Sequence, residues 1–141
     1  NPKSVSDILG VSGRIVKAGK RLVVAGNLEY GGSKHVATAV LTMQKKFPKI
    51  RSAINIRYDQ KTIERLQKTK NKISSYDRTD EPADTKNREN SSISWGVERA
   101  IRNSKSAPDI IYHTGDIGKE PMIIIFGENP KQVVAKVSKI L

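Results

Sequence analysis

One run of the chain, residues 122–126, consists only of apolar side chains and constrains the fold more than any other segment. Because turn residues and prolines bound it closely on both sides, the run is too short for a core helix and is typical of a buried strand. A strand without alternating polar residues has other elements packed on it. Helical and strand patterns mix along the rest of the chain without strict alternation, which predicts a mixed sheet with helices packed on it.

The remaining segments supply the other strands and the helices. Apolar residues at intervals of three and four predict an amphipathic helix over 34–46, with Ser33 as its N-cap. Residues 77–91 are polar and lack periodicity, so we expect a long loop there. Strands 13–18 and 21–25 are expected around a Gly19–Lys20 turn, and further strands are expected at 53–58, 72–76 and 109–113. The other expected helices are 60–70, 92–102 with Ser92 as its cap, and one that begins at Pro130.

Composition bounds the chemistry of the chain. None of the 141 residues is cysteine, which excludes disulfides, thiolate zinc sites and cysteine nucleophiles and fits a cytoplasmic location. The net charge is +12, and it is concentrated in residues 1–60. A lysine-rich surface and attraction of anions both account for this excess. The few aromatic residues are not interleaved with basic ones, so a nucleic-acid partner is disfavoured and small phosphorylated ligands fit better.

The length of the chain is typical of a single domain, which we expect to span residues 1–141. The apolar runs are far too short to span a bilayer, so we expect no membrane partner. The first residue is Asn1 rather than Met, and we therefore expect a C-terminal fragment of a longer chain.

The first candidate site is the stretch Gly31-Gly32-Ser33-Lys34-His35, which leads into the helix expected over 34–46. Backbone N–H groups and the helix dipole favour an anion at such a terminus. Glycine permits close approach of the backbone, while Ser33 offers a hydroxyl donor and either Lys34 or His35 a positive partner. The alternative is that the glycines and Ser33 only begin the helix and that His35 makes a structural hydrogen bond.

Three further candidates carry charge. The turn 115–121 contains two glycines and Lys119, but it lacks the spacing of a phosphate-binding P-loop, and a backbone nest for an anion and an ordinary turn are both open. Asn55 and Arg57 share one face of an otherwise apolar strand, where either a ligand or a salt bridge would satisfy them. Asp77 and Arg78 lie in the loop expected over 77–91, for which a solvated charged loop is the alternative.

Six motifs, taken in order, resemble the ThiN family of archaeal thiamine-phosphate synthase domains. The chain departs from the family pattern at Thr38, where arginine is frequent, and at His113, where aspartate is common. The motifs are Ser12-Gly13-Arg14-Ile15, Tyr30-Gly31-Gly32-Ser33-Lys34-His35-Val36-Ala37, Ala53-Ile54-Asn55-Ile56-Arg57-Tyr58, Tyr76-Asp77-Arg78 with Glu81-Pro82, Trp95-Gly96, and Pro108-Asp109 through to Gly118-Lys119-Glu120-Pro121.

The resemblance implies a three-layer α/β/α fold with a mixed, mostly antiparallel sheet, as in the class II aldolase group. It implies the condensation of hydroxymethylpyrimidine diphosphate with hydroxyethylthiazole phosphate to give thiamine phosphate and pyrophosphate. Arg14 and His35 occupy the positions of the family's catalytic arginine and histidine. The expected substrate-binding and phosphate-binding residues are Gly31, Gly32, Ser33, Asn55, Arg57, Asp77, Arg78, Lys119 and Glu120.

The resemblance also bears on cofactors and partners. Asp77 and Glu120 are candidates either to steady arginine side chains or to hold Mg²⁺. Such domains often follow an N-terminal hydroxymethylpyrimidine kinase domain in the same chain, and a homo-oligomer is compatible with the sequence. The alternative function is a non-catalytic thiamine-phosphate-sensing domain of a transcriptional regulator, and a nucleic-acid-binding module rests on charge alone.

Overall fold

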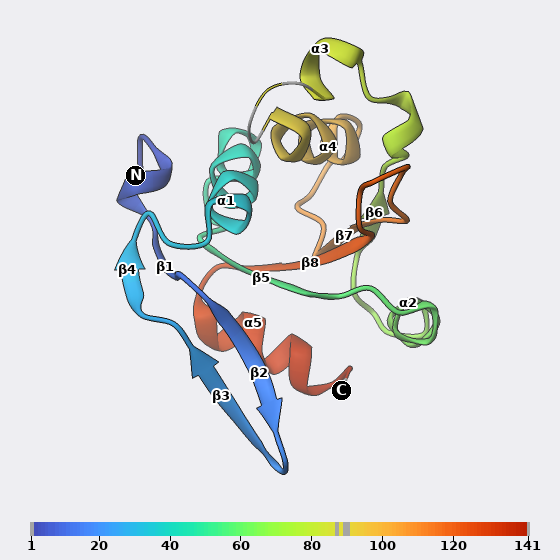
Figure 1. Cartoon of the computed structure of the whole chain (residues 1–141). Coiled ribbons are helices and arrows are strands. Elements are labelled where there is room, and N and C mark those ends of the chain that lie inside the picture. The colour runs from blue at the N-terminus through green and yellow to red at the C-terminus, as the bar shows by residue number, and fades with distance from the viewer. Residues whose placement is uncertain (1, 87, 89–90, 141) are drawn as a thin grey trace.

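The centre of the molecule is a four-stranded mixed sheet, seen in a computed structural model that describes residues 2–86, 88 and 91–140 (Figure 1). The strand order is β5-β8-β7-β6, and only the β6–β7 pair is parallel. The expected mixed, mostly antiparallel sheet is therefore confirmed. The bounds are β5 Ser52–Arg57, β6 Ile73–Ser75, β7 Ile110–His113 and β8 Met122–Gly127.

Helices cover both faces of this sheet. On one face lie α1 (Lys34–Lys46) and α4 (Ser91–Ile101), and on the other lie α2 (Gln60–Gln67) and α5 (Pro130–Ser138), as Figure 1 shows. This is the three-layer α/β/α arrangement expected from the family resemblance. Asn129 caps α5 with its side chain, and Pro130 is the first residue of the helix.

Strand β8 explains why the apolar run at 122–126 is uninterrupted. Ile124 and Phe126 pack into the core beneath α1 and α4, whereas Ile123 and Ile125 pack into the core beneath α2 and α5. All four side chains are at most 2% exposed. Since alternate side chains of a strand point to opposite faces, a central strand covered by helices on both faces has no position left for a polar residue.

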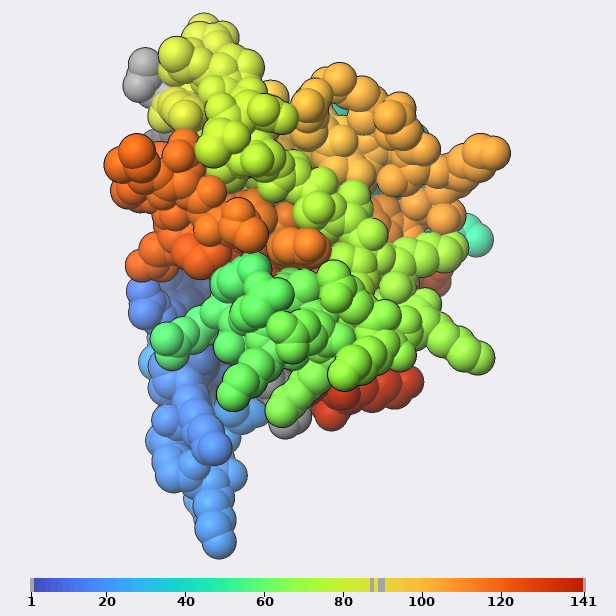
Figure 2. Space-filling view, turned by 90° about the vertical axis from the view of Figure 1, so that its right-hand side faces the viewer, coloured from blue at the N-terminus to red at the C-terminus, as the bar shows by residue number. Residues whose placement is uncertain are grey.

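The two N-terminal strands form a hairpin as expected, but the hairpin lies outside the central sheet. Strands β2 (Arg14–Ala18) and β3 (Arg21–Ala25) pair only with each other and project from the body as an arm, which we define as residues 14–25 (Figures 1 and 2). The expectation that this hairpin contributes to the mixed sheet is therefore wrong. A second small pair, β1 (Leu9–Val11) with β4 (Leu28–Tyr30), forms the base of the arm.

The segment expected to be a long loop is partly ordered into local helices. Arg78–Asp80 form a 3₁₀ turn capped by Asp77, and Ala83–Lys86 form the short helix α3. Residues 87, 89 and 90 of this segment lie outside the described residues. Helix α4 already includes Ser91, so Ser92 is not its N-cap. Another short 3₁₀ turn, Val5–Asp7, precedes β1.

Among the described residues, no helix is long and apolar enough to cross a membrane.

Candidate functional site

The glycine-rich stretch before α1 forms a tight turn with two left-handed residues. Gly31 has φ +78°, and Ser33, at the N-cap position, has φ 53° and ψ 56°. The Ser33 side chain makes no capping hydrogen bond to the backbone of α1, unlike a conventional serine cap. The position of Ser33 is as expected, but its predicted capping role is wrong. Its hydroxyl, at the positive end of the helix dipole, is available to an anion.

Gly32 has a packing role that the sequence did not reveal. It is buried, and its backbone lies against that of Gly10 in β1. A Cβ on Gly32 would stand 2.6 Å from the Gly10 carbonyl oxygen, and a Cβ on Gly10 would stand 2.6 Å from the Gly32 carbonyl oxygen. This pair of glycines fixes the base of the arm against the N-terminus of α1.

Gly32→Ala is expected to lower the free energy of unfolding by about 1–3 kcal/mol, because two backbone segments must separate to admit the methyl group. Urea denaturation followed by circular dichroism measures the change. Gly19→Ala is the control for loss of a glycine as such: Gly19 sits at the tip of the arm with φ +62° and no atom within 4 Å of its Cβ position. Equal losses in both variants would show that the Gly10 contact adds nothing to the ordinary cost of replacing a glycine.

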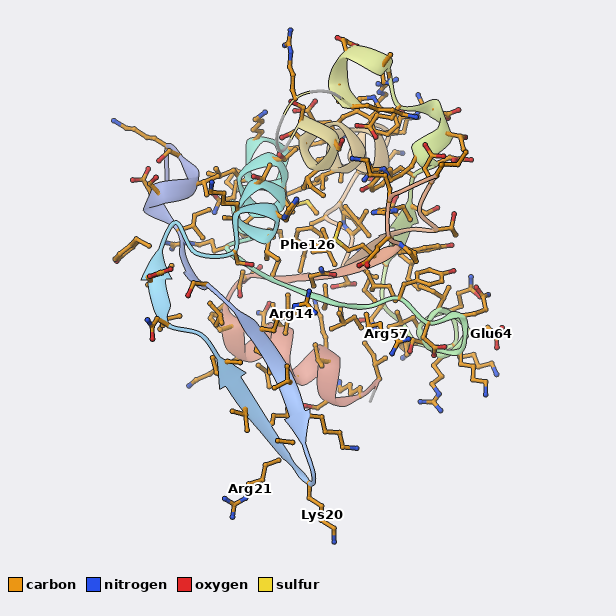
Figure 3. The ribbon with its side chains drawn as sticks, viewed as in Figure 1. Arg14, Lys20, Arg21, Arg57, Glu64 and Phe126 are labelled. Carbon is orange, nitrogen blue, oxygen red and sulfur yellow. The ribbon has the colours of Figure 1, made fainter. Side chains whose placement is uncertain are left out.

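His35 and Arg14 are both exposed, but they lie on different elements. His35 is in the first turn of α1, whereas Arg14 is the first residue of β2, at the base of the arm (Figure 3). Arg14 is four residues beyond Gly10, and the chain bends at Ser12 and Gly13 between β1 and β2. The two predicted catalytic residues therefore come from different elements that meet at the base of the arm.

A second group of predicted residues lies at the other end of β5. Strand pairing aligns Arg57 with Met122 and Met122 with His113, so all three occupy one row on the sheet face that α1 and α4 cover. Asn55 is on the same face, one row further in, and both Asn55 and Arg57 are exposed. The predicted shared face is confirmed. Figure 3 shows Arg57 near α2, well apart from Arg14.

Next to this row is a buried polar cluster, which we call the strand-end cluster. The Arg78 guanidinium donates to the Glu81 carboxylate at 2.7 Å, with the Arg78 side chain 6% exposed and that of Glu81 0% exposed. The Ser92 hydroxyl donates to the other oxygen of Glu81. The Tyr76 ring lies 5.0 Å from the His113 ring. The strand-end cluster is Tyr76, Arg78, Glu81, Ser92 and His113.

Two atoms of the strand-end cluster have no hydrogen-bond partner among the described residues: the Arg78 Nε and the Tyr76 hydroxyl. Burial raises the pKa of Tyr76 to about 12. The sequence pointed to Arg78 but not to the side chains that enclose it. The available signal was the spacing of Arg78 and Glu81, because oppositely charged residues three apart can pair within a helical turn.

The turn between β7 and β8 places the remaining predicted residues. Lys119 and Glu120 are exposed in it, and Asp116 and Lys119 form a backbone bridge across it. Asp116 accepts from the Lys86 ammonium at 2.9 Å, and hydrogen bonds to Lys86 and to the Ile117 backbone hold its pKa below the usual value. Asp77 accepts from the backbone and side chain of Thr79, which lowers its pKa too.

His113 joins the strand-end cluster to this turn. It is 2% exposed, and its Nδ1 accepts a hydrogen bond from the Gly115 backbone at 3.1 Å. Burial, and secondly the positive charge of Arg78, lower the pKa of His113 to about 4. The imidazole is therefore neutral at pH 7 and acts as an acceptor that fixes the start of the turn.

The lowered pKa of His113 predicts a pH-dependent stability. Between pH 6.5 and about 4 the unfolded chain binds a proton at His113 that the folded chain does not, so the free energy of unfolding falls as pH falls. A shift of this size corresponds to a loss of about 2–3 kcal/mol at pH 4 relative to pH 7. Urea titrations at pH 7.0, 5.5 and 4.5 measure it, with His113→Gln as the comparison. The same pH slope in the variant would show that other groups cause the loss.

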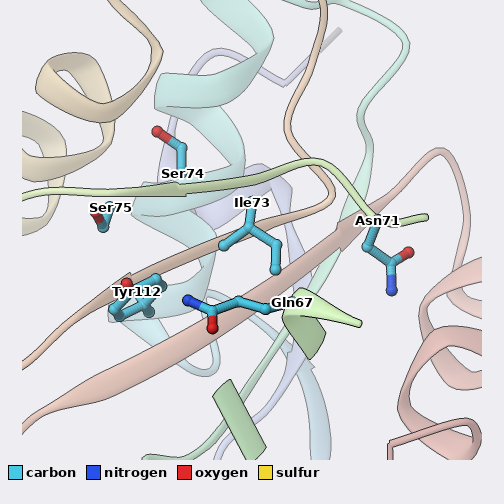
Figure 4. Close-up of a pocket in the computed structure, with 6 residues that line it drawn as sticks. All are labelled: Gln67, Asn71, Ile73, Ser74, Ser75 and Tyr112. Atoms are coloured by element: carbon cyan, nitrogen blue, oxygen red, sulfur yellow. The ribbon is translucent and has the colours of Figure 1, made fainter. Parts of the chain in front are cut away.

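Two open pockets flank β6, and both are largely separate from the predicted residues. One, of about 570 Å³, is lined by Gln67, Ile73 and Tyr112 among others (Figure 4). The other, of about 420 Å³, includes Asp77, Tyr76 and His113. Within the described part of the chain, no group of three or more His, Asp or Glu residues is placed to hold a metal ion.

Comparison with known proteins gives this geometry a context. The family described as "Thiamine-phosphate synthase ThiN" matches residues 1–139. The chain is 41% identical over 141 residues to the thiamine-phosphate synthase ThiN of Methanothermobacter thermautotrophicus, covering all of this chain and 74% of that protein. It is 39% identical to the bifunctional thiamine biosynthesis protein ThiDN of Methanocaldococcus jannaschii, covering 99% of this chain and 32% of that protein.

Solved structures agree with the family match. The C-terminal domain of a phosphomethylpyrimidine kinase superposes with a TM-score of 0.90 at 48% identity, over 99% of this chain and 78% of that one. The C-terminal domain of protein MJ0236 superposes with a TM-score of 0.86 at 38% identity, over 99% and 74%. The family resemblance seen in the six motifs is thereby confirmed over nearly every residue, and the chain belongs to the thiamine-phosphate synthase ThiN family.

Proposed function

We propose that this chain is a thiamine-phosphate synthase domain, which condenses hydroxymethylpyrimidine diphosphate with hydroxyethylthiazole phosphate. The observation that carries the proposal is family membership across the full length, at 41% identity to a synthase. The thiazole nitrogen attacks the exocyclic methylene carbon of the pyrimidine, and a C–N bond forms as the C–O bond to the diphosphate breaks. Thiamine phosphate and pyrophosphate are the products.

The proposed chemistry needs groups that hold anions and stabilise a leaving diphosphate, and it needs no protein nucleophile. We assign one phosphate group to the N-terminus of α1, where Gly31 and Gly32 shape the turn and Ser33 and His35 supply donors. Dipole, hydroxyl and imidazole all favour negative charge at that place.

We assign the leaving diphosphate to the cationic side chains. The candidates to neutralise it are Arg14 on the arm, Arg57 at the end of β5 and Lys119 in the β7–β8 turn, and all three are exposed. Because Arg57 lies well apart from Arg14 within one chain (Figure 3), these side chains would not all contact the diphosphate at once. Asn55, on the same face as Arg57, would orient a ring or a phosphate. Arg78 would act indirectly, because its buried ion pair with Glu81 stabilises the 3₁₀ turn that Asp77 caps.

Asp77 and Glu120 would steady arginine side chains in this scheme. A kinase domain upstream in the same chain is a further part of the proposal, supported by the ThiDN relative and by the neighbour that is the C-terminal domain of a kinase.

The direct test is incubation of the chain with both phosphorylated substrates, followed by mass spectrometry for thiamine phosphate and pyrophosphate. We expect both products, in equal amounts, well above a control without protein. If thiamine phosphate binds tightly but no product forms, the chain is a sensor domain instead. The upstream sequence gives independent evidence, since a kinase domain favours the synthase and a helix-turn-helix favours the sensor.

A further inference from the structure

The arm exposes an unusual amount of apolar surface. Ten large apolar side chains are exposed in the described residues, and eight of these lie between Leu9 and Tyr30. The five that lie on the hairpin itself occupy both of its faces. Ile15, Leu22 and Val24 share one face, and Val16 and Val23 share the other. Exposed apolar surface concentrated in this way marks an interaction site in a folded protein.

The two edges of the arm differ in how they are protected. Strand β2 carries Arg14 at its start and Lys17 within it, and charged side chains on an edge discourage pairing with another strand. Strand β3 is uncharged from Leu22 to Ala25. It therefore presents an open, apolar edge, and a two-stranded hairpin alone is only marginally stable in water.

We propose that β3 pairs with β3 of a second copy of this chain, antiparallel and across a two-fold axis, to form a four-stranded sheet from two arms. A second copy is the proposed occupant because two identical strands can pair antiparallel across a two-fold axis. Each strand then supplies the donors and acceptors that the other needs, so both subunits use the same surface. No complementary surface has to be assumed on another protein.

Charge is compatible with this pairing. The arm carries four basic residues and no acidic one: Arg14, Lys17, Lys20 and Arg21. In a register that places Val24 opposite the partner's Val24 at the axis, Arg21 and the partner's Arg21 lie about 20 Å apart. This exceeds the screening length of about 8 Å at physiological salt. The cationic tip, which points away from the body in Figure 3, then approaches the base of the other arm, where Glu29 is exposed.

The surface on the β3 side of the arm is substantial as well. A standard interface removes about 800 Å² of surface from each partner. The large apolar side chains on β3 and just after it, Leu22, Val23, Val24, Leu28 and Tyr30, are each exposed by 44–72% and add to the backbone edge that the pairing covers. Leu28 and Tyr30, exposed by 66% and 72%, extend the surface from the arm to its base, beside which the partner's tip would lie.

The oligomeric state of the 141-residue chain tests the proposal independently of any activity. We expect light scattering after size exclusion to give twice the 15.6 kDa chain mass at about 10 μM. Val24→Lys should raise the dissociation constant at least tenfold, since it places two like charges side by side at the axis. The matched control is Ile15→Lys: Ile15 is the cross-strand partner of Val24, shares its face and is exposed similarly, but it lies on the outer strand β2.

The cysteine-free sequence permits a second measurement on the folded protein. Val24→Cys should form a disulfide-linked dimer on mild oxidation, and Ile15→Cys should not. Circular dichroism checks that each variant is folded, as expected because the arm does not belong to either core cluster. A monomeric chain at 100 μM would overturn the proposal and leave the arm to another occupant, such as an upstream domain. Dissociation by Ile15→Lys but not by Val24→Lys would also overturn it.

Discussion

Replacement of Glu81 by glutamine is expected to lower the free energy of unfolding by about 3–5 kcal/mol, the usual cost of removing one partner from a buried ion pair. The Arg78 guanidinium stays charged, and its 6% exposed side chain has no other carboxylate bonded to it in the described residues. Ser92 also loses the carboxylate that accepts its hydroxyl hydrogen bond. Urea denaturation at pH 7 measures the change.

The exposed pair Lys45–Glu98 is the matched control. Its side chains are 67% and 54% exposed, and the N···O distance is 3.0 Å. Glu98→Gln should therefore cost less than about 1 kcal/mol. The double variant Arg78→Met, Glu81→Leu should recover much of the loss, because the isolated buried charge is removed. A loss below 1 kcal/mol for Glu81→Gln would show that Arg78 finds another partner or reaches water.

Removal of the His35 side chain is expected to lower kcat/KM by about 10²–10³, the typical effect of losing one preorganised group that stabilises developing charge. Arg14→Ala should have an effect of the same order, since it removes a cation proposed to neutralise the leaving diphosphate. Neither change should alter stability by more than about 0.5 kcal/mol, because both side chains are exposed. Steady-state kinetics with both substrates, together with melting curves, gives these values.

Arg21→Ala is the control for loss of positive charge on the arm. Arg21 is exposed on the same hairpin, but it lies at the tip, away from α1 (Figure 3). Its turnover should stay within about twofold of the unchanged chain. Comparable losses in Arg14→Ala and Arg21→Ala would indicate a general electrostatic effect. A normal rate in His35→Ala or in Arg14→Ala would remove that residue from the proposed mechanism.

The elements that the sequence predicted well are those whose local pattern has one interpretation. The spacing of apolar residues in α1 and the unbroken apolar run of β8 are both explained by burial, and the Gly19–Lys20 turn fixed the pairing of β2 with β3. Strand alternation also placed Asn55 and Arg57 on one face. In each case the structure is determined either by contacts between residues close in sequence or by complete burial of the segment.

The errors concern contacts between distant segments. A hairpin pattern does not state which sheet the hairpin joins, and the arm proved to join none. Ser33 and Ser92 have the residue type of helix caps, but a left-handed backbone and a buried carboxylate, respectively, give them other roles. The enclosure of Arg78 by Glu81, Ser92 and His113 comes from three elements that meet only in the folded chain.

The order in which the sheet is built has a consequence for biosynthesis. Strand β5 pairs with β8 alone, from Ser52 with Gly127 to Arg57 with Met122, and β7 needs β8 on its antiparallel side. Among the four strands of this sheet, the inner strand β8 is thus the last to be synthesised. Until residue 127 has left the exit tunnel, β5 and its apolar face have no partner strand. We therefore expect this sheet to fold only after β8 has been synthesised, through closure of a loop of about 70 residues.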